Sequence, residues 1–177
     1  LTCFVGDSSE NCRIALFCDA SFAGDLRDSK STSGAFLAIV GPNTFVPICW
    51  FCKKQGAVSH SSTEAEVIAL EAAARLEGLP CLMLWEQVLR VFSNGKVGRN
   101  SDIKTTKLIK QPSPVDHLHS ILIKIDEVPT TIKDPSGLAV LVMLEDNEAV
   151  IKMTIKGRSP NMRHVSRTHR VDLDWLY

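Results

Sequence analysis

Apolar residues are spaced along this chain in two ways, one typical of strands and one of helices. Four short runs are rich in β-branched and aromatic residues, as strands are, and they cover residues 13–18, 34–40, 45–52 and 138–144. Gly41-Pro42-Asn43 separates the second run from the third. So short a turn predicts that these two strands form an antiparallel hairpin.

Helical spacing begins after the third run. Ser61 with Glu64, and Thr63 with Glu66, each fit the capping box, and apolar residues continue to Leu76. Gly78 is placed to end this helix as its C′ residue, and Pro80 to open a second helix over 80–91. A further helix is expected over 147–153, after the fourth strand.

Residues 92–137 lack either spacing and contain several prolines: Pro112, Pro114, Pro129 and Pro135. This stretch is too long for an ordinary connection between two elements. We therefore expect one domain over residues 1–177, with a loop insertion at 92–137 that lies outside the core.

Composition narrows the class of partner. The chain is 45% hydrophobic and has a formal net charge of zero, so no overall field attracts a polyanion. One stretch, 149–171, has basic residues without any Asp or Glu; it is either a nucleic-acid contact or a solvated face.

No apolar run reaches the roughly 18 residues of a membrane-spanning helix. The first residues, without an initiator Met, suggest a fragment of a longer protein.

The cysteine and histidine pairs are poor metal motifs. Cys49 and Cys52 form a CxxC pair within an apolar, strand-like run, and no second such pair completes a zinc site. The six cysteines are better explained as reduced and buried. His117 and His119 lie in a polar loop, where a His-x-His pair is usually not a ligand set.

Three carboxylates stand out by their positions. Asp19 follows the first strand, Asp146 follows the fourth, and Glu66 lies in the first turn of the first helix. If the two strands are neighbours and the helix crosses the sheet, the three acids meet at one edge. Such a cluster is costly unless cations occupy it, and ligands that are all oxygen suit magnesium or manganese. Residues two apart on a helix face different sides, so Glu64 and Glu66 cannot both belong to this cluster; the resemblance described next implies that Glu66 is the ligand and that Glu64 caps the helix.

Six blocks in this order resemble the ribonuclease H domain of copia-type LTR retrotransposon Pol polyproteins. They are Cys-Asp-Ala-Ser-Phe-Ala-Gly-Asp at 18–25, Lys-Ser-Thr-Ser-Gly at 30–34, Trp-Phe-Cys-Lys-Lys-Gln at 50–55, Ser-Ser-Thr-Glu-Ala-Glu at 61–66, Glu-Asp-Asn-Glu-Ala-Val at 145–150 and Arg-His-Val-Ser-Arg-Thr at 163–168. Together they are spread over most of 13–91 and 138–177.

The resemblance implies an α/β, RNase H-like fold: a mixed sheet of three antiparallel strands plus a parallel fourth, with helices packed on it. It implies hydrolysis of the RNA strand of RNA–DNA hybrids with two magnesium or manganese ions, and Asp19, Glu66 and Asp146 as the catalytic metal ligands. We expect contacts to nucleic acid from Lys53, Lys54, Ser62, Thr63, Asn147, Lys152, Lys156, Arg158, Arg163 and Arg167.

The same resemblance implies a partner and a place in the cell. The partner is the reverse transcriptase domain of the same polyprotein, and the location is intracellular, in a cytoplasmic virus-like particle or the nucleus, without a membrane. The family's fourth acid is expected beyond Tyr177, so the last strand and helix of the fold would be missing. Two alternatives stay open: a degenerate domain that only binds nucleic acid or polyprotein segments, and another two-metal nuclease or integrase of this fold.

Overall fold

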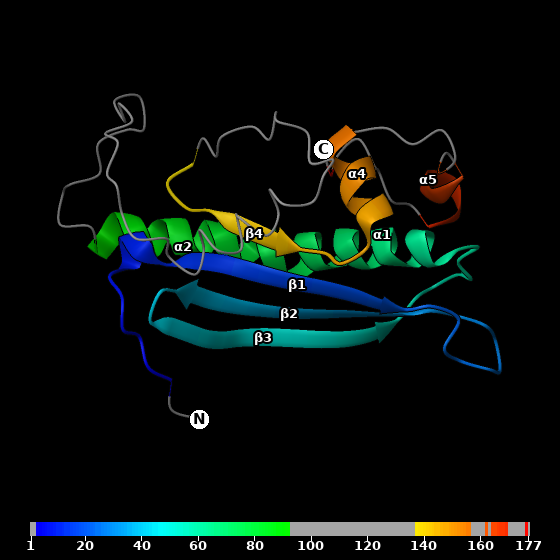
Figure 1. Cartoon of the computed structure of the whole chain (residues 1–177), viewed down its shortest axis with the longest axis horizontal. Coiled ribbons are helices and arrows are strands. Elements are labelled where there is room, and N and C mark those ends of the chain that lie inside the picture. Colours follow the sequence, from blue (N-terminus) through cyan, green and yellow to red (C-terminus); the bar gives the residue numbers. More distant parts are fainter. Residues whose placement is uncertain (1–2, 93–136, 157–161, 163, 170–175, 177) are drawn as a thin grey trace.

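A single mixed sheet organises the molecule, which we describe from a computed structural model. The structure describes residues 3–92, 137–156, 162, 164–169 and 176. The strands lie in the order β3-β2-β1-β4, and they comprise β1 (Arg13–Ser21), β2 (Thr32–Gly41), β3 (Thr44–Lys54) and β4 (Leu141–Leu144). In Figure 1, β1 and β4 run side by side in the same direction, and the helices lie behind and above the sheet.

The pairing of the strands confirms the predicted fold class. β1 with β2, and β2 with β3, are antiparallel, whereas β1 with β4 is parallel. The predicted hairpin is present, since Gly41 pairs with Thr44 across a two-residue turn. Its register shifts between Leu37 and Ala38, next to Pro47 on β3. A proline without an N–H is tolerated there because β3 is an edge strand in the described sheet.

The helices follow the predicted order. They are the 3-10 turn η1 (Ser9–Asn11), α1 (Ser62–Ala73), the π-helical segment η2 (Ala74–Gly78), α2 (Leu79–Phe92), α4 (Glu148–Lys156) and α5 (Val165–Thr168). No helix among the described residues is long and apolar enough to cross a membrane.

The core lies between the sheet and α1. Ile14 and Leu16 of β1 and Leu37 of β2 are almost fully buried against Val67 of α1, and Val150 of α4 joins the same cluster. Alternate residues of β1 supply this face, as the two-residue period of a strand requires. Asp19 is out of phase with these residues and is exposed.

The prediction that the chain leaves helical geometry between the first two helices is wrong. The chain continues from α1 through η2 into α2 without leaving helical geometry, so Gly78 is no C′ residue and Pro80 is the second residue of α2. The need for glycine is steric instead. A Cβ on Gly78 would come within 3.0 Å of side-chain atoms of both Leu16 and Leu141, so a side chain at this position would require these two leucines to shift.

Two strand ends also differ from the prediction. β1 continues to Ser21, so Asp19 lies inside the strand and not at its end. β4 begins at Leu141, not at 138, and its residues are half-buried, whereas the apolar run suggested burial on both faces. Most of the expected insertion at 92–137, including His117 and His119, lies outside the described residues.

Candidate metal centre

Three carboxylates, one on β1, one on α1 and one in the segment after β4, meet beside the carboxyl ends of β1 and β4. Asp19, Glu66 and Asp146 each offer an oxygen atom, and these atoms all lie within 4.8 Å of one another. The strand register explains how two of them come together. Phe17 pairs with Leu144 in the parallel ladder, and Asp19 and Asp146 are each two residues further along. The structure thus brings together the three acids singled out in the sequence.

The start of α1 is held against the sheet by a buried glutamine. Gln55 Nε2 donates to Ser33 Oγ and to the Ala65 carbonyl oxygen, both at 2.9 Å. Ser59 donates to Gln55 Oε1 at 2.8 Å. This network joins β2, the end of β3 and the first turn of α1, so it fixes where Glu66 meets the strands.

The carboxyl group of Glu66 is the buried member of the cluster. Its Oε2 is buried without a hydrogen-bond partner, while the Ala20 backbone N–H donates to the side chain. Burial, followed by the charges of Asp19 and then Asp146, raises the pKa of Glu66 to about 7. A buried oxygen that lacks a donor, among like charges, is a site suited to a cation.

A fourth carboxylate, Glu145, stands beside this cluster and was not singled out in the sequence. Burial raises its pKa to about 7, and the charges of Glu66, Asp146 and Asp19 act in the same direction against a hydrogen bond from the Asn147 N–H. Its Oε2 is buried and unpartnered. The sequence does carry a signal for Glu145, because it directly precedes Asp146 after β4, but position alone does not say which acids of that pair face the cluster.

The donor set fits a hard divalent cation. All four side chains offer oxygen, which magnesium and manganese prefer. Cys18 carries a neutral thiol in this environment, because burial, then Glu145 and Glu66, raises the pKa of the thiol to about 12. Metal-binding thiols act as thiolates, so this shift disfavours Cys18 as a ligand.

Glu64 lies apart from the acidic cluster, as expected for a capping residue. Its backbone N–H donates to the N-cap Ser61 Oγ at 3.1 Å, and its Oε2 accepts from the His60 backbone N–H at 2.8 Å. The carboxylate is thus directed toward the N-terminal end of α1, and it does not share the cations of Glu66.

The residues predicted to contact nucleic acid fall into three groups. Lys53, Lys156 and Ser62 are exposed, and Thr63 is half-buried. Lys54 and Lys152 are engaged in ion pairs, and Asn147 uses its side chain to cap α4. Outside the described part of the chain are Arg158, Arg163 and the side chain of Arg167.

In the second group, which consists of Lys54, Lys152 and Asn147, each side chain already has partners within the protein. Lys54 Nζ lies 2.6 Å from Asp25 Oδ2 and 2.8 Å from Asp28 Oδ2, so a phosphate would have to compete with two carboxylates. Lys152 lies 2.9 Å from Glu148. Asn147 Oδ1 accepts from the Ala149 N–H at 3.0 Å.

The cysteine pair on β3 has no shared site. Cys49 Sγ donates to Glu77 Oε2 at 3.1 Å, and Cys52 is exposed. All six cysteines are free, but only Cys12 and Cys18 are buried. The absence of disulfides agrees with the expectation that the cysteines are reduced. The expectation that they are buried is correct for two of the six.

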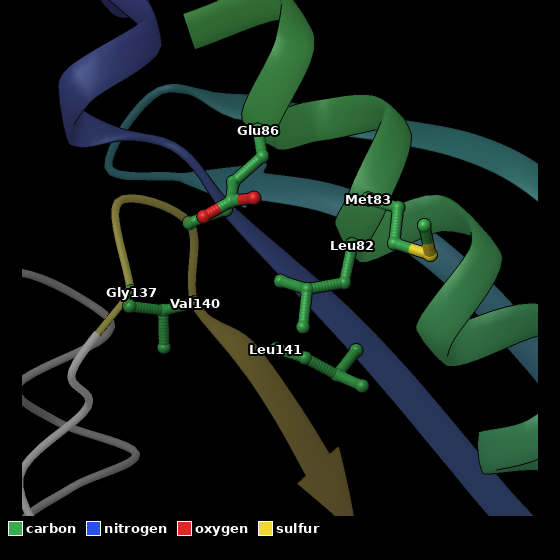
Figure 2. A pocket seen from close by; sticks show the side chains of 7 residues that line it. Leu82, Met83, Glu86, Gly137, Val140 and Leu141 are labelled. Atoms are coloured by element: carbon green, nitrogen blue, oxygen red, sulfur yellow. The ribbon is translucent and has the colours of Figure 1, made fainter.

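A cavity of about 380 Å³ lies between α2 and the start of β4. Figure 2 shows Leu82 and Met83 on the helix side and Val140 and Leu141 on the strand side, with Glu86 as the charged side chain. The cavity is at the beginning of β4, whereas the carboxylates follow its end. It is therefore separate from the acidic cluster.

No protein-family model matches the chain, and no solved structure matches it significantly. Function must therefore be argued from the residues and from the geometry of the site.

Proposed function

We propose that this chain is a two-metal nuclease domain that hydrolyses the RNA strand of RNA–DNA hybrids. The observation that carries the proposal is the convergence of Asp19, Glu66 and Asp146, whose ligand atoms lie within 4.8 Å of one another. The confirmed sheet, with three antiparallel strands and a parallel fourth, supports it. The six sequence blocks that resemble copia-type ribonuclease H domains support it independently.

Each acid has a distinct role in this proposal. Asp19 would contribute to holding both cations, and Glu66 and Asp146 would each contribute to holding one of them. Bound magnesium or manganese supplies an activated water and stabilises the leaving oxygen of the phosphodiester. With its pKa raised to about 7, the carboxyl group of Glu66 is partly protonated near neutral pH when no cation is present, and the protonated form must lose its proton before it ligates.

The choice of substrate and partner rests on the resemblance. It favours a hybrid duplex over other nucleic acids, and the reverse transcriptase domain of the same polyprotein as the neighbour, in a virus-like particle or the nucleus. The exposed Lys53, Lys156 and Ser62 are available for backbone contacts. Lys54 would contribute only after releasing Asp25 and Asp28.

Cleavage of end-labelled duplexes tests the proposal. The purified protein is incubated with an RNA–DNA hybrid, double-stranded RNA or double-stranded DNA, with magnesium, with manganese or with a chelator. We expect cleavage of the RNA strand of the hybrid alone, and only with a divalent cation. Asp19→Asn should abolish it, whereas Glu10→Gln, which changes an exposed glutamate of η1, should leave it unchanged.

The other results identify the alternatives. Hybrid binding without cleavage, in the wild type and in Asp19→Asn alike, would mean a domain that only binds nucleic acid. Cleavage of double-stranded DNA in preference to the hybrid would mean another nuclease of the same fold. Cleavage that persists in Asp19→Asn would show that the acidic cluster is not the active centre.

A further inference from the structure

A second cluster of chemically active side chains surrounds the start of α1, and the proposed nuclease function does not use it. It consists of Glu64 and three histidines: His60, His164 and His169. His60 directly precedes the N-cap Ser61, and the other two flank α5. In Figure 1, α5 lies beside the end of α1 where the helix begins. Residues from distant parts of the sequence are thus gathered around one carboxylate.

The distances in this cluster suit a metal better than a simple ion pair. His60 Nδ1 lies 3.4 Å from Glu64 Oε2, and His164 Nε2 lies 3.3 Å from the same oxygen. Charge-assisted hydrogen bonds between nitrogen and carboxylate oxygen are shorter, about 2.7–2.9 Å. Zinc bonds of about 2.0–2.1 Å at tetrahedral angles place neighbouring ligand atoms roughly 3.3 Å apart. One ligand atom from each of these three residues lies within 4.8 Å of the other two.

Two buried polar atoms in the cluster lack partners. The side chains of Glu64 and His169 are 1% and 3% exposed, and Glu64 Oε1 lies 3.0 Å from His169 Nε2. The two groups are not aligned for a hydrogen bond, so both atoms remain unsatisfied. Buried polar atoms are almost always partnered. A small reorientation of Glu64 toward a cation would let its second oxygen accept from His169.

We propose that His60 Nδ1, His164 Nε2 and the Glu64 carboxylate form a zinc site. Imidazole nitrogen with one carboxylate is a donor set that zinc accepts and magnesium does not prefer. His169 is a positioning residue, which holds the second oxygen of Glu64 as outer partners of metal ligands do. His60 and His164 are 71% and 44% exposed, so the ion has a path from solvent and its fourth position faces water.

The zinc site ties α5 to the first turn of α1. The ligands come from both sides of a long stretch of sequence, so the bound ion restrains the chain far more than a local pair would. This site is distinct from the acidic cluster, because Glu64 and Glu66 lie in different ligand groups. The inference does not depend on nuclease activity.

Zinc binding to the purified 177-residue protein tests the inference. Metal-depleted protein is titrated with Zn²⁺ alone in competition with a chromophoric chelator. We expect one ion per chain, and a rise in melting temperature when it binds. His60→Ala and His164→Ala should each weaken binding at least about tenfold, and His169→Gln about tenfold. Because His60 is largely exposed, its variant should fold normally, and circular dichroism checks this.

Matched controls locate the ion. Asp19→Asn should bind Zn²⁺ as the wild type does. So should the double variant His117→Ala/His119→Ala, which removes the two other histidines of the chain. Cobalt substitution should give a spectrum without thiolate charge transfer. No zinc binding, zinc lost in either control, or a thiolate signature in the cobalt spectrum would each overturn the inference.

Discussion

Glu64 and Glu66 lie two residues apart in α1 and are both buried. Their environments shift the pKa of the two carboxyl groups in opposite directions. Burial raises the pKa of Glu66 to about 7, and the charges of Asp19 and Asp146 add to it. Burial also acts to raise the pKa of Glu64, but the His60 N–H, the His164 hydrogen bond and the charges of His164 and His169 lower it on balance. One carboxyl group thus lies among acids and the other among donors.

The comparison shows that burial does not decide the chemistry of a carboxylate. The helix directs residues two apart to different sides, so Glu66 meets β1 and the segment after β4, while Glu64 meets His60 and α5. Glu64 is stabilised as an anion by neighbours that the protein already has. Glu66 needs either a proton or a cation. The same helical turn therefore contributes to two different groups of side chains, each of which could hold a cation.

The largest expected difference between the two glutamates comes from removing the charge of each one. Glu64→Gln keeps an acceptor for the His60 N–H but loses the charge-assisted bonds, so the free energy of unfolding of metal-free protein should fall by about 1–2 kcal/mol at pH 7. Glu66→Gln removes repulsion and should raise it by about 1 kcal/mol, after allowance for solvent screening of Asp19 and Asp146. Urea unfolding measures both.

A control for these two variants is available on α4. Glu148→Gln changes an exposed glutamate and should alter the free energy of unfolding by less than about 0.5 kcal/mol. If Glu64→Gln and Glu66→Gln change the free energy of unfolding in the same direction, the proposed contrast between the two environments is contradicted.

Loss of the Gln55 network should weaken magnesium binding at the acidic cluster and leave zinc binding at the histidine cluster unchanged. Gln55→Ala leaves the partner groups of Ser33, Ser59 and Ala65 unpaired in a buried place. We expect a loss of about 1–3 kcal/mol in the free energy of unfolding. Magnesium affinity should fall with it because Glu66 loses its fixed position, whereas zinc affinity should not. Parallel titrations check this, and equal losses of both metals would argue against a separate role for the network.

The pH dependence of stability should carry the signature of raised carboxyl pKa values. Glu66 and Glu145 each have a folded-state pKa of about 7, above the ordinary glutamate pKa of 4.5. Their contribution to stability is therefore fully present below about pH 4.5 and is lost as the pH rises through about 7. Glu64, with its lowered pKa, contributes in the opposite sense: its stabilisation is present above its unfolded value and is lost in acid.

Unfolding of metal-free protein at several pH values measures this. In Glu66→Gln the decline of the free energy of unfolding between about pH 5 and pH 8 should become shallower. In the wild type, saturating magnesium should remove most of this decline. A decline that is unchanged in both conditions would mean that neither carboxyl group titrates in this range.

The smallest effect is expected from Glu145→Gln. Glu145 is not among the three acids whose ligand atoms cluster, so its loss should change magnesium affinity less than loss of Glu66. Stability of metal-free protein at pH 8 should rise by less than about 1 kcal/mol. Calorimetric titration compares the variants. A loss of affinity equal to that of Glu66→Gln would make Glu145 a direct ligand.

The sequence predicted the acidic cluster from strand and helix positions together with the resemblance. Asp19 and Asp146 follow runs that pair in parallel, so they reach the same edge of the sheet. Both Glu64 and Glu66 fit a capping box, and the choice of Glu66 rested on the resemblance. The histidine cluster was not predictable in this way. Nothing in the spacing of residues 60 or 164 says that α5 packs against the start of α1.

Errors in the predicted elements also have physical causes. Gly78 has the residue type of a helix C′, but its role is to let η2 approach Leu16 and Leu141, a long-range contact that local rules do not include. β1 extends past Asp19 because its partner β2 continues to Thr32, and Ser21 pairs with it. Strand ends are thus set by the neighbouring strand as much as by their own residues.

Calorimetric titration of magnesium into the wild type, Glu64→Gln and Glu66→Gln tests the central claim most directly. The claim is that Glu66, with Asp19 and Asp146, forms a centre for hard cations, and that Glu64 does not belong to it. We expect Glu66→Gln to weaken magnesium binding at least about tenfold, and Glu64→Gln to change it by no more than about twofold. Equal weakening in the two variants, or none in either, would contradict the claim.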